Sequence, residues 1–238
     1  MLEGGAGHFD SLGLGPQPAT YREDGEIVEL PEDFYSTRFF AEKMIEYIDR
    51  GADDEQPFFA FLSFSAVHWP LQAPPESIAR FAGRYNEGYD ALYASRMRAL
   101  EQLGLIEEGL DVVPRKLGEE SWDVLSVEDK NYQARMMEIY AAMLNDVDIY
   151  VGKLIDTLSA NGQLENTAVF VMSDNGAEGH YLDEDPFFED WIKECCNNSY
   201  ENMGKADSYL FYGPNWARAS VGPFAKYKGY STQGGIRV

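Results

Sequence analysis

The stretch that most limits the fold is an apolar run that ends abruptly in small and polar residues. Residues 168–172 read Ala-Val-Phe-Val-Met, and Ser-Asp-Asn-Gly follows directly. The run predicts a strand buried on both faces, with residues 173–176 as its exit loop. Ligands of open α/β sheets bind beyond the carboxyl ends of strands, so Asp174 and Asn175 are candidate ligands for a hard cation. The alternative is an ordinary Asp-Asn-Gly turn without a ligand.

A second apolar run places a histidine at an equivalent position. Residues 58–66, Phe-Phe-Ala-Phe-Leu-Ser-Phe-Ser-Ala, predict another buried strand, and His68 follows two residues later. A lone histidine in a loop is usually structural. Because His68 follows the end of a second predicted strand, a role in a binding or catalytic site is equally open for it. The other two histidines, His8 and His180, lie among glycines and acidic residues and are interpreted as solvated loop residues.

Helical periodicity recurs before, between and after these two runs. Apolar residues at intervals of three and four predict helices over about 34–49, from 75 or 76 onward, over about 90–105, 127–159 and 187–195. Helices that lead into buried strands are typical of α/β folds. The rest of 181–226 is interpreted as an ordered loop around a site, with its aromatic side chains either lining a pocket or packing within the loop: Trp191, Tyr209, Tyr212 and Trp216.

Composition excludes several classes of partner. The 41 acidic residues against 19 basic ones give a net charge of −22, which argues against nucleic acid because phosphate contacts need clustered Lys and Arg. No apolar run approaches the ~20 residues of a membrane span, and the first residues do not resemble a signal peptide. The only cysteines, Cys195 and Cys196, are adjacent and are expected to be free thiols.

Two lysines near the carboxyl end are candidates for binding an oxyanion. Lys226 and Lys228 shortly precede Gly234-Gly235, and an ammonium group accommodates varied phosphate or sulfate geometries. The alternative is that both lysines are simply solvated.

Three segments together carry a family resemblance. SAVHWPLQAP at 65–74, VMSDNGAEG at 171–179 and YKGYSTQGGIRV at 227–238 resemble, in this order and spacing, the bacterial and fungal type I arylsulfatases of the alkaline phosphatase superfamily. The resemblance spans nearly the whole chain. It implies an α/β fold, with residues 1–238 as a single partial catalytic domain that contributes part of a mixed sheet flanked by helices. It also implies hydrolysis of small-molecule sulfate monoesters.

The resemblance assigns roles to four residues. Asp174 and Asn175 would bind a divalent cation, generally Ca²⁺. His68 would contact the sulfate ester and protonate the leaving oxygen, and Lys228 would bind sulfate oxygens. The spacing of lysine to the Gly-Gly pair selects Lys228, which leaves Lys226 as a surface residue.

One departure from the family concerns the nucleophile. Type I sulfatases use a formylglycine made within a CxPxR motif, and this sequence contains no such motif, since neither cysteine has a proline two positions later. The paired aspartates that complete the family's metal site are also not found. We therefore expect the nucleophile in a segment preceding Leu2, and an internal fragment that shows no turnover alone.

Two other functions remain open. The first is hydrolysis of phosphate diesters or phosphonate monoesters by an enzyme of the same superfamily, but relatives that cleave phosphonates tend to carry His where this chain has Asn175. The second is a noncatalytic metal-binding module.

Overall fold

The computed structural model describes residues 4–52, 56–110 and 121–237. The α-helices in these ranges are α1 (Ser36–Arg50), α2 (Pro75–Ala79), α3 (Gly88–Gln102), α4 (Val127–Ala160), α5 (Pro186–Cys195), α6 (Gly213–Val221) and α7 (Gln233–Ile236). Short 3₁₀ turns are η1 (Trp122–Val124), η2 (Leu164–Asn166) and η3 (Tyr200–Asn202). Strands β1 (Arg22–Glu23) and β2 (Glu26–Ile27) form an antiparallel hairpin that pairs Arg22 with Ile27.

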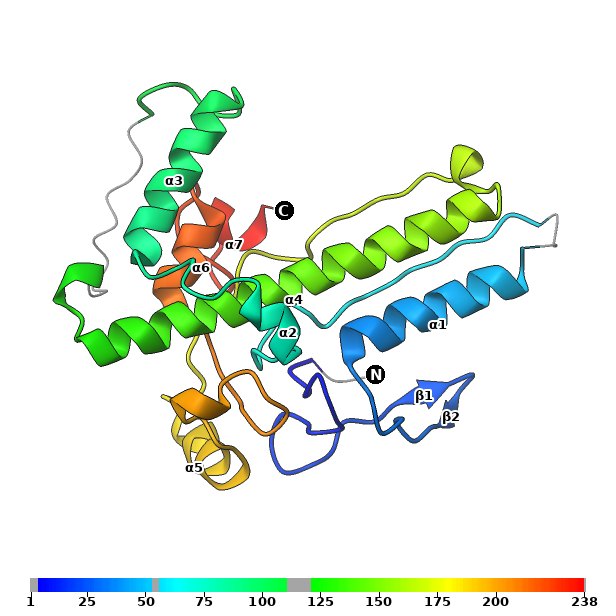
Figure 1. The fold of residues 1–238 in the computed structure, drawn as a ribbon, viewed down its shortest axis with the longest axis horizontal. Helices are drawn as coiled ribbons and strands as arrows, with labels where there is room; N and C mark the ends of the chain where they lie inside the picture. Colours follow the sequence, from blue (N-terminus) through cyan, green and yellow to red (C-terminus); the bar gives the residue numbers. More distant parts are fainter. Residues whose placement is uncertain (1–3, 53–55, 111–120, 238) are drawn as a thin grey trace.

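The long helix α4 is the axis of the molecule, and α1, α2 and α3 pack against it (Figure 1). It begins where the Ser126 hydroxyl accepts a hydrogen bond from the Asp129 backbone N–H at 3.1 Å, a side-chain cap. Its inward face buries Met136, Ile139 and Met143. The helix predicted over 127–159 is confirmed as α4. The helices predicted over about 34–49, from 75 or 76 onward and over 187–195 are confirmed as α1, α2 and α5. The helix predicted over 90–105 is present as α3 but begins two residues earlier and ends three earlier.

Helix α6 was not predicted, and it completes the core. Trp216 on α6 is fully buried, packs edge-on against Tyr89 and Trp122 at ring distances of 5.5 and 5.9 Å, and donates its indole N–H to the Gln133 carbonyl. The segment was interpreted as a loop because Gly, Pro and Asn are frequent in it. Of the four aromatic residues considered as pocket walls, Tyr209, Tyr212 and Trp216 are instead buried core residues.

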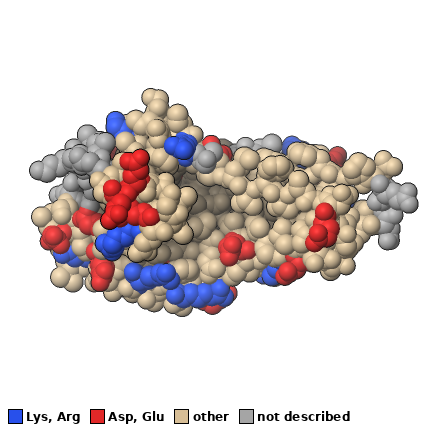
Figure 2. Space-filling model, turned by 90° about the horizontal axis from the view of Figure 1, so that it is seen from above, with Lys and Arg blue, Asp and Glu red and all other residues tan. Residues whose placement is uncertain are grey.

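Neither predicted strand belongs to a sheet in the part of the chain that the structure describes. Residues 58–66 and 168–172 run as extended traces in Figure 1, and neither belongs to a sheet among the described residues. Phe59 and Phe170 are 91% and 81% exposed, so the prediction that these runs are buried on both faces is wrong. Neighbouring strands satisfy the backbone of a strand, and helices or a second sheet cover its faces. No hydrogen-bonded neighbour flanks either run in the described ranges. On the face drawn in Figure 2, few charged side chains are visible over the half of the molecule that holds the end of α4.

This exposed apolar surface predicts self-association of the isolated 238-residue chain. Burying each exposed phenylalanine favours association by about 1.5–3 kcal/mol. Sedimentation velocity should therefore show oligomers for the wild-type chain and a shift toward monomer for Phe59→Lys/Phe170→Lys. Ile27→Lys, which changes an exposed apolar residue in the β1–β2 hairpin, should leave association unaltered. A wild-type chain that is monomeric and unfolds cooperatively would contradict this prediction.

The adjacent cysteines form a disulfide bond, so the prediction of free thiols is wrong. Cys195 ends α5, whereas Cys196 has an extended backbone with φ −135° and ψ 146°. This change of backbone direction at the end of the helix brings the two sulfur atoms together.

In the described part of the chain, no helix is both long and apolar enough to cross a membrane.

Candidate functional site

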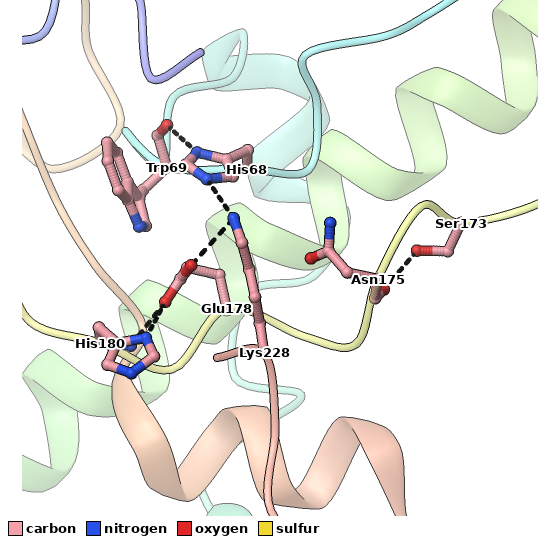
Figure 3. Close-up of polar contacts among 7 residues, drawn as sticks. All are labelled: His68, Trp69, Ser173, Asn175, Glu178, His180 and Lys228. Carbon is pink, nitrogen blue, oxygen red and sulfur yellow. Dashed lines mark hydrogen bonds and ion pairs between the residues drawn. The ribbon is translucent and has the colours of Figure 1, made fainter. Parts of the chain in front are cut away.

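His68 and Lys228 meet although 160 residues separate them in the sequence. The Lys228 Nζ atom lies 3.0 Å from His68 Nε2, and His68 Nδ1 lies 2.9 Å from the Trp69 carbonyl oxygen (Figure 3). Because a carbonyl oxygen only accepts, the His68 proton is on Nδ1, and Nε2 accepts from the Lys228 ammonium. Burial lowers the pKa of His68 most strongly, and the nearby positive charge of Lys228 lowers it further. The hydrogen bond to the Trp69 carbonyl opposes this and raises the pKa, but it does not outweigh the other two effects.

The backbone explains how Lys228 reaches this position. The segment with Asp174 and Asn175 docks on the segment with Lys228 through two hydrogen bonds, from Gly176 N–H to the Gly235 carbonyl at 3.0 Å and from Lys228 N–H to the Ala177 carbonyl at 2.9 Å. A Cβ atom on Gly176 would overlap the carbonyl oxygen of Gly234. Glycine is therefore required at Gly176 for the close approach of these two segments.

A second glycine brings a histidine into the same site. Gly229 has φ +90°, and a Cβ atom there would lie 2.8 Å from Cε1 of His180. The Lys-Gly pair thus lets His180 approach the backbone next to Lys228. His180 is half exposed, as expected for a loop histidine, but it contacts the site through Glu178.

Glu178 is a site residue that the sequence interpretation missed. Its Oε2 atom lies 3.1 Å from Lys228 Nζ, and its Oε1 atom accepts hydrogen bonds from the His180 backbone N–H at 2.9 Å and from its ring Nδ1 at 2.6 Å. Burial alone would raise the pKa of Glu178, but the hydrogen bonds from His180 and Lys228 outweigh it and lower that pKa. The only sequence signal was the position of Glu178 within the segment 171–179.

Asp174 and Asn175 lie beside this network. Asn175 lies on the segment that docks against the Lys228 segment, and its backbone carbonyl accepts a hydrogen bond from the Ser173 hydroxyl at 2.7 Å (Figure 3). The Asp174 carboxylate is exposed and close enough to His68 for its charge to raise the pKa of that ring. Ca²⁺ takes six to eight oxygen ligands, and the described residues contain no group of three or more His, Cys, Asp or Glu side chains that could hold a metal. Carboxylate and amide oxygens are of the kind that bind Ca²⁺, but the side chains of Asp174 and Asn175 alone do not fill its coordination shell.

His8 is buried and contacts the backbone of His68, so the interpretation of His8 as a solvated loop residue is wrong. It is 1% exposed, its Nδ1 lies 2.7 Å from the Ser36 hydroxyl, and its Nε2 lies 3.4 Å from the carbonyl oxygen of His68. Its own backbone N–H donates to Gln72 Oε1 at 2.6 Å. These bonds fasten the amino-terminal loop to the segment that carries His68.

Burial lowers the pKa of His8 to about 4 from an ordinary value of 6.5, which predicts an acid-dependent loss of stability. The unfolded chain binds a proton at His8 as pH falls below 6.5, whereas the folded protein does not until about pH 4. The free energy of unfolding should therefore fall by about 3 kcal/mol across this window through His8 alone. Urea midpoints of the full-length gene product and of His8→Gln, compared over this range, should converge as pH falls. Parallel loss of stability in both proteins would refute the assignment.

With this geometry established, comparison with known proteins identifies the family. A sulfatase family model matches residues 5–209. The chain belongs to the sulfatase family, and its fold is part of the α/β sulfatase fold expected from the sequence.

Two relatives match the entire chain at 42% identity. One is an uncharacterized sulfatase of Schizosaccharomyces pombe, of which the match covers 45%, and the other is an arylsulfatase of Klebsiella aerogenes, of which it covers 52%. The chain thus spans about half the length of these curated relatives. Among solved structures, that of Ps i-CgsB aligns with 92% of this chain and 30% of its own, at 20% identity and a TM-score of 0.48.

Proposed function

We propose that the full-length gene product containing this chain is a calcium-dependent arylsulfatase that hydrolyses sulfate monoesters. The observation that carries the proposal is the contact between Lys228 and His68 in a member of the sulfatase family. The 42% identity to an arylsulfatase supports the choice of ester.

In this proposal, Lys228 and His68 serve opposite ends of the ester. The Lys228 ammonium binds sulfuryl oxygens and stabilises the charge they carry. When the ester binds, its sulfate group replaces His68 Nε2 as an acceptor for Lys228, and His68 in its protonated form faces the bridging oxygen. As the sulfur–oxygen bond breaks, His68 gives its Nε2 proton to that oxygen and becomes neutral. The lowered pKa of His68 makes it a stronger acid for this step.

Asp174 and Asn175 would hold the cation through their side-chain oxygens. Bound calcium would supply positive charge at the sulfate group. The nucleophile would be a formylglycine, as in the family that the sequence resembles, and residues 1–238 contain no CxPxR motif to provide it. We therefore propose that residues 1–238 alone do not turn over.

The test is hydrolysis of para-nitrophenyl sulfate by the full-length gene product. We expect turnover that a calcium chelator removes and added Ca²⁺ restores, and no turnover above background by residues 1–238. Absence of turnover in the calcium-loaded full-length protein would overturn the proposed activity. Undiminished turnover after chelation would overturn the calcium requirement.

A further inference from the structure

We propose that Glu178 is a positioning residue that fixes the Lys228 ammonium group for sulfate binding. The inference rests on the proposed function, and it concerns a residue whose role neither the motif spacing nor the resemblance supplied. Glu178 acts through Lys228 and does not itself contact the substrate.

Hydrogen bonds to two acceptors hold the ammonium group of Lys228. Lysine has a long, flexible side chain, and its ammonium carries three N–H donors. Two acceptors are placed around Lys228 Nζ, with His68 Nε2 at 3.0 Å and Glu178 Oε2 at 3.1 Å. Together they confine the nitrogen before the ester binds, and Glu178 keeps its hydrogen bond when the sulfate group replaces His68 Nε2, so little side-chain entropy is lost on binding.

Glu178 is itself held in place by its own hydrogen bonds. Its side chain is 12% exposed, and both hydrogen bonds from His180 fall on Oε1, which leaves Oε2 directed at Lys228 (Figure 3). The neighbouring Ala177 carbonyl accepts from the Lys228 backbone N–H. The Lys228 ammonium and the Glu178 carboxylate are therefore both fixed to the two docked segments. A positioning contact requires this rigidity.

The negative charge of Glu178 distinguishes a positioning role from a direct role in substrate binding. A carboxylate beside Lys228 partly cancels the positive charge available to an anionic ester, so Glu178 weakens substrate attraction. A residue that served only to bind the anionic ester would not carry this negative charge, because the charge repels the ester. Replacing it with glutamine should therefore lower kcat by loosening Lys228, while KM stays the same or falls because a negative charge is removed.

The experiment is a double-mutant cycle in the full-length gene product with para-nitrophenyl sulfate. Glu178→Gln should lower kcat by about tenfold or more with no rise in KM. In a Lys228→Ala background, the same substitution should change kcat/KM by less than about twofold, because its target is gone. Glu189→Gln, which removes the carboxylate of the exposed pair with Lys193 on α5, should keep wild-type kcat and KM.

Equal losses from Glu178→Gln in both backgrounds would overturn the proposal, because a general structural defect is additive with loss of Lys228. A rise in KM at unchanged kcat would overturn it as well. Crystal structures of the wild type and Glu178→Gln test it independently of any activity. Lys228 Nζ should leave hydrogen-bond distance of His68 Nε2 in the variant, and an unaltered Lys228–His68 contact would refute the inference even if the wild type hydrolyses sulfate esters.

Discussion

Lys228→Ala in the full-length gene product is expected to lower kcat/KM for an aryl sulfate ester by about 10²- to 10³-fold. The substitution removes a preorganised donor from a position where charge develops in the transition state. The loss should appear mainly in kcat, because the ammonium is most needed when the sulfuryl charge is greatest.

Lys226→Ala is the matched control for this prediction. Lys226 precedes Lys228 by two residues, but its ammonium lies over the Tyr230 ring, 4.1 Å from the ring centre, and not against His68. Steady-state kinetics should show nearly wild-type kcat/KM for Lys226→Ala. If Lys226→Ala loses more activity than Lys228→Ala, the assignment of the sulfate-binding lysine is wrong.

Gly176→Ala is expected to cause the second large effect, on both stability and activity. The added methyl group would overlap the Gly234 carbonyl oxygen and break the hydrogen bond from Gly176 to Gly235. Forcing these segments apart should cost about 1–3 kcal/mol of folding free energy. It should also move Asn175 relative to Lys228, which lowers turnover beyond what the loss of stability explains.

Gly152→Ala provides the control for the glycine substitution. Gly152 lies in α4, and a Cβ atom there would have no heavy atom within 4 Å outside its own chain neighbours and the local helix backbone. Alanine should be neutral or stabilise the protein by about 0.5–1 kcal/mol, because glycine is unfavourable inside helices. Urea midpoints and kcat for both variants are the measurements. Wild-type stability and turnover of Gly176→Ala would contradict the close approach of the two segments.

The helices were predictable from the sequence where local signals were sufficient. The period of α4 and its cap at Ser126 depend on residues near one another in sequence, and both are confirmed. Helix α6 was missed because burial of Trp216 among Tyr89 and Trp122 stabilises it, and this is a tertiary contact. The runs at 58–66 and 168–172 were predicted as buried strands, but neither is paired among the described residues, because pairing depends on neighbouring strands that a single apolar run does not specify.

The site was only partly predictable for the same reason. Asp174 and His68 were selected because each follows an apolar run, and the family resemblance selected Lys228. Glu178 and His8 were missed because their importance comes from what they contact. Glu178 bonds to Lys228 and His8 bonds to the His68 carbonyl, and both partners are distant in sequence.

The most direct test of the central claim compares matched para-nitrophenyl esters with the calcium-loaded full-length gene product. We predict a higher kcat/KM for the sulfate monoester than for the corresponding phosphate diester or phosphonate monoester, because Asn175 occupies the position where phosphonate-cleaving relatives tend to carry histidine. A higher kcat/KM for the phosphate diester or the phosphonate would contradict the assignment as an arylsulfatase.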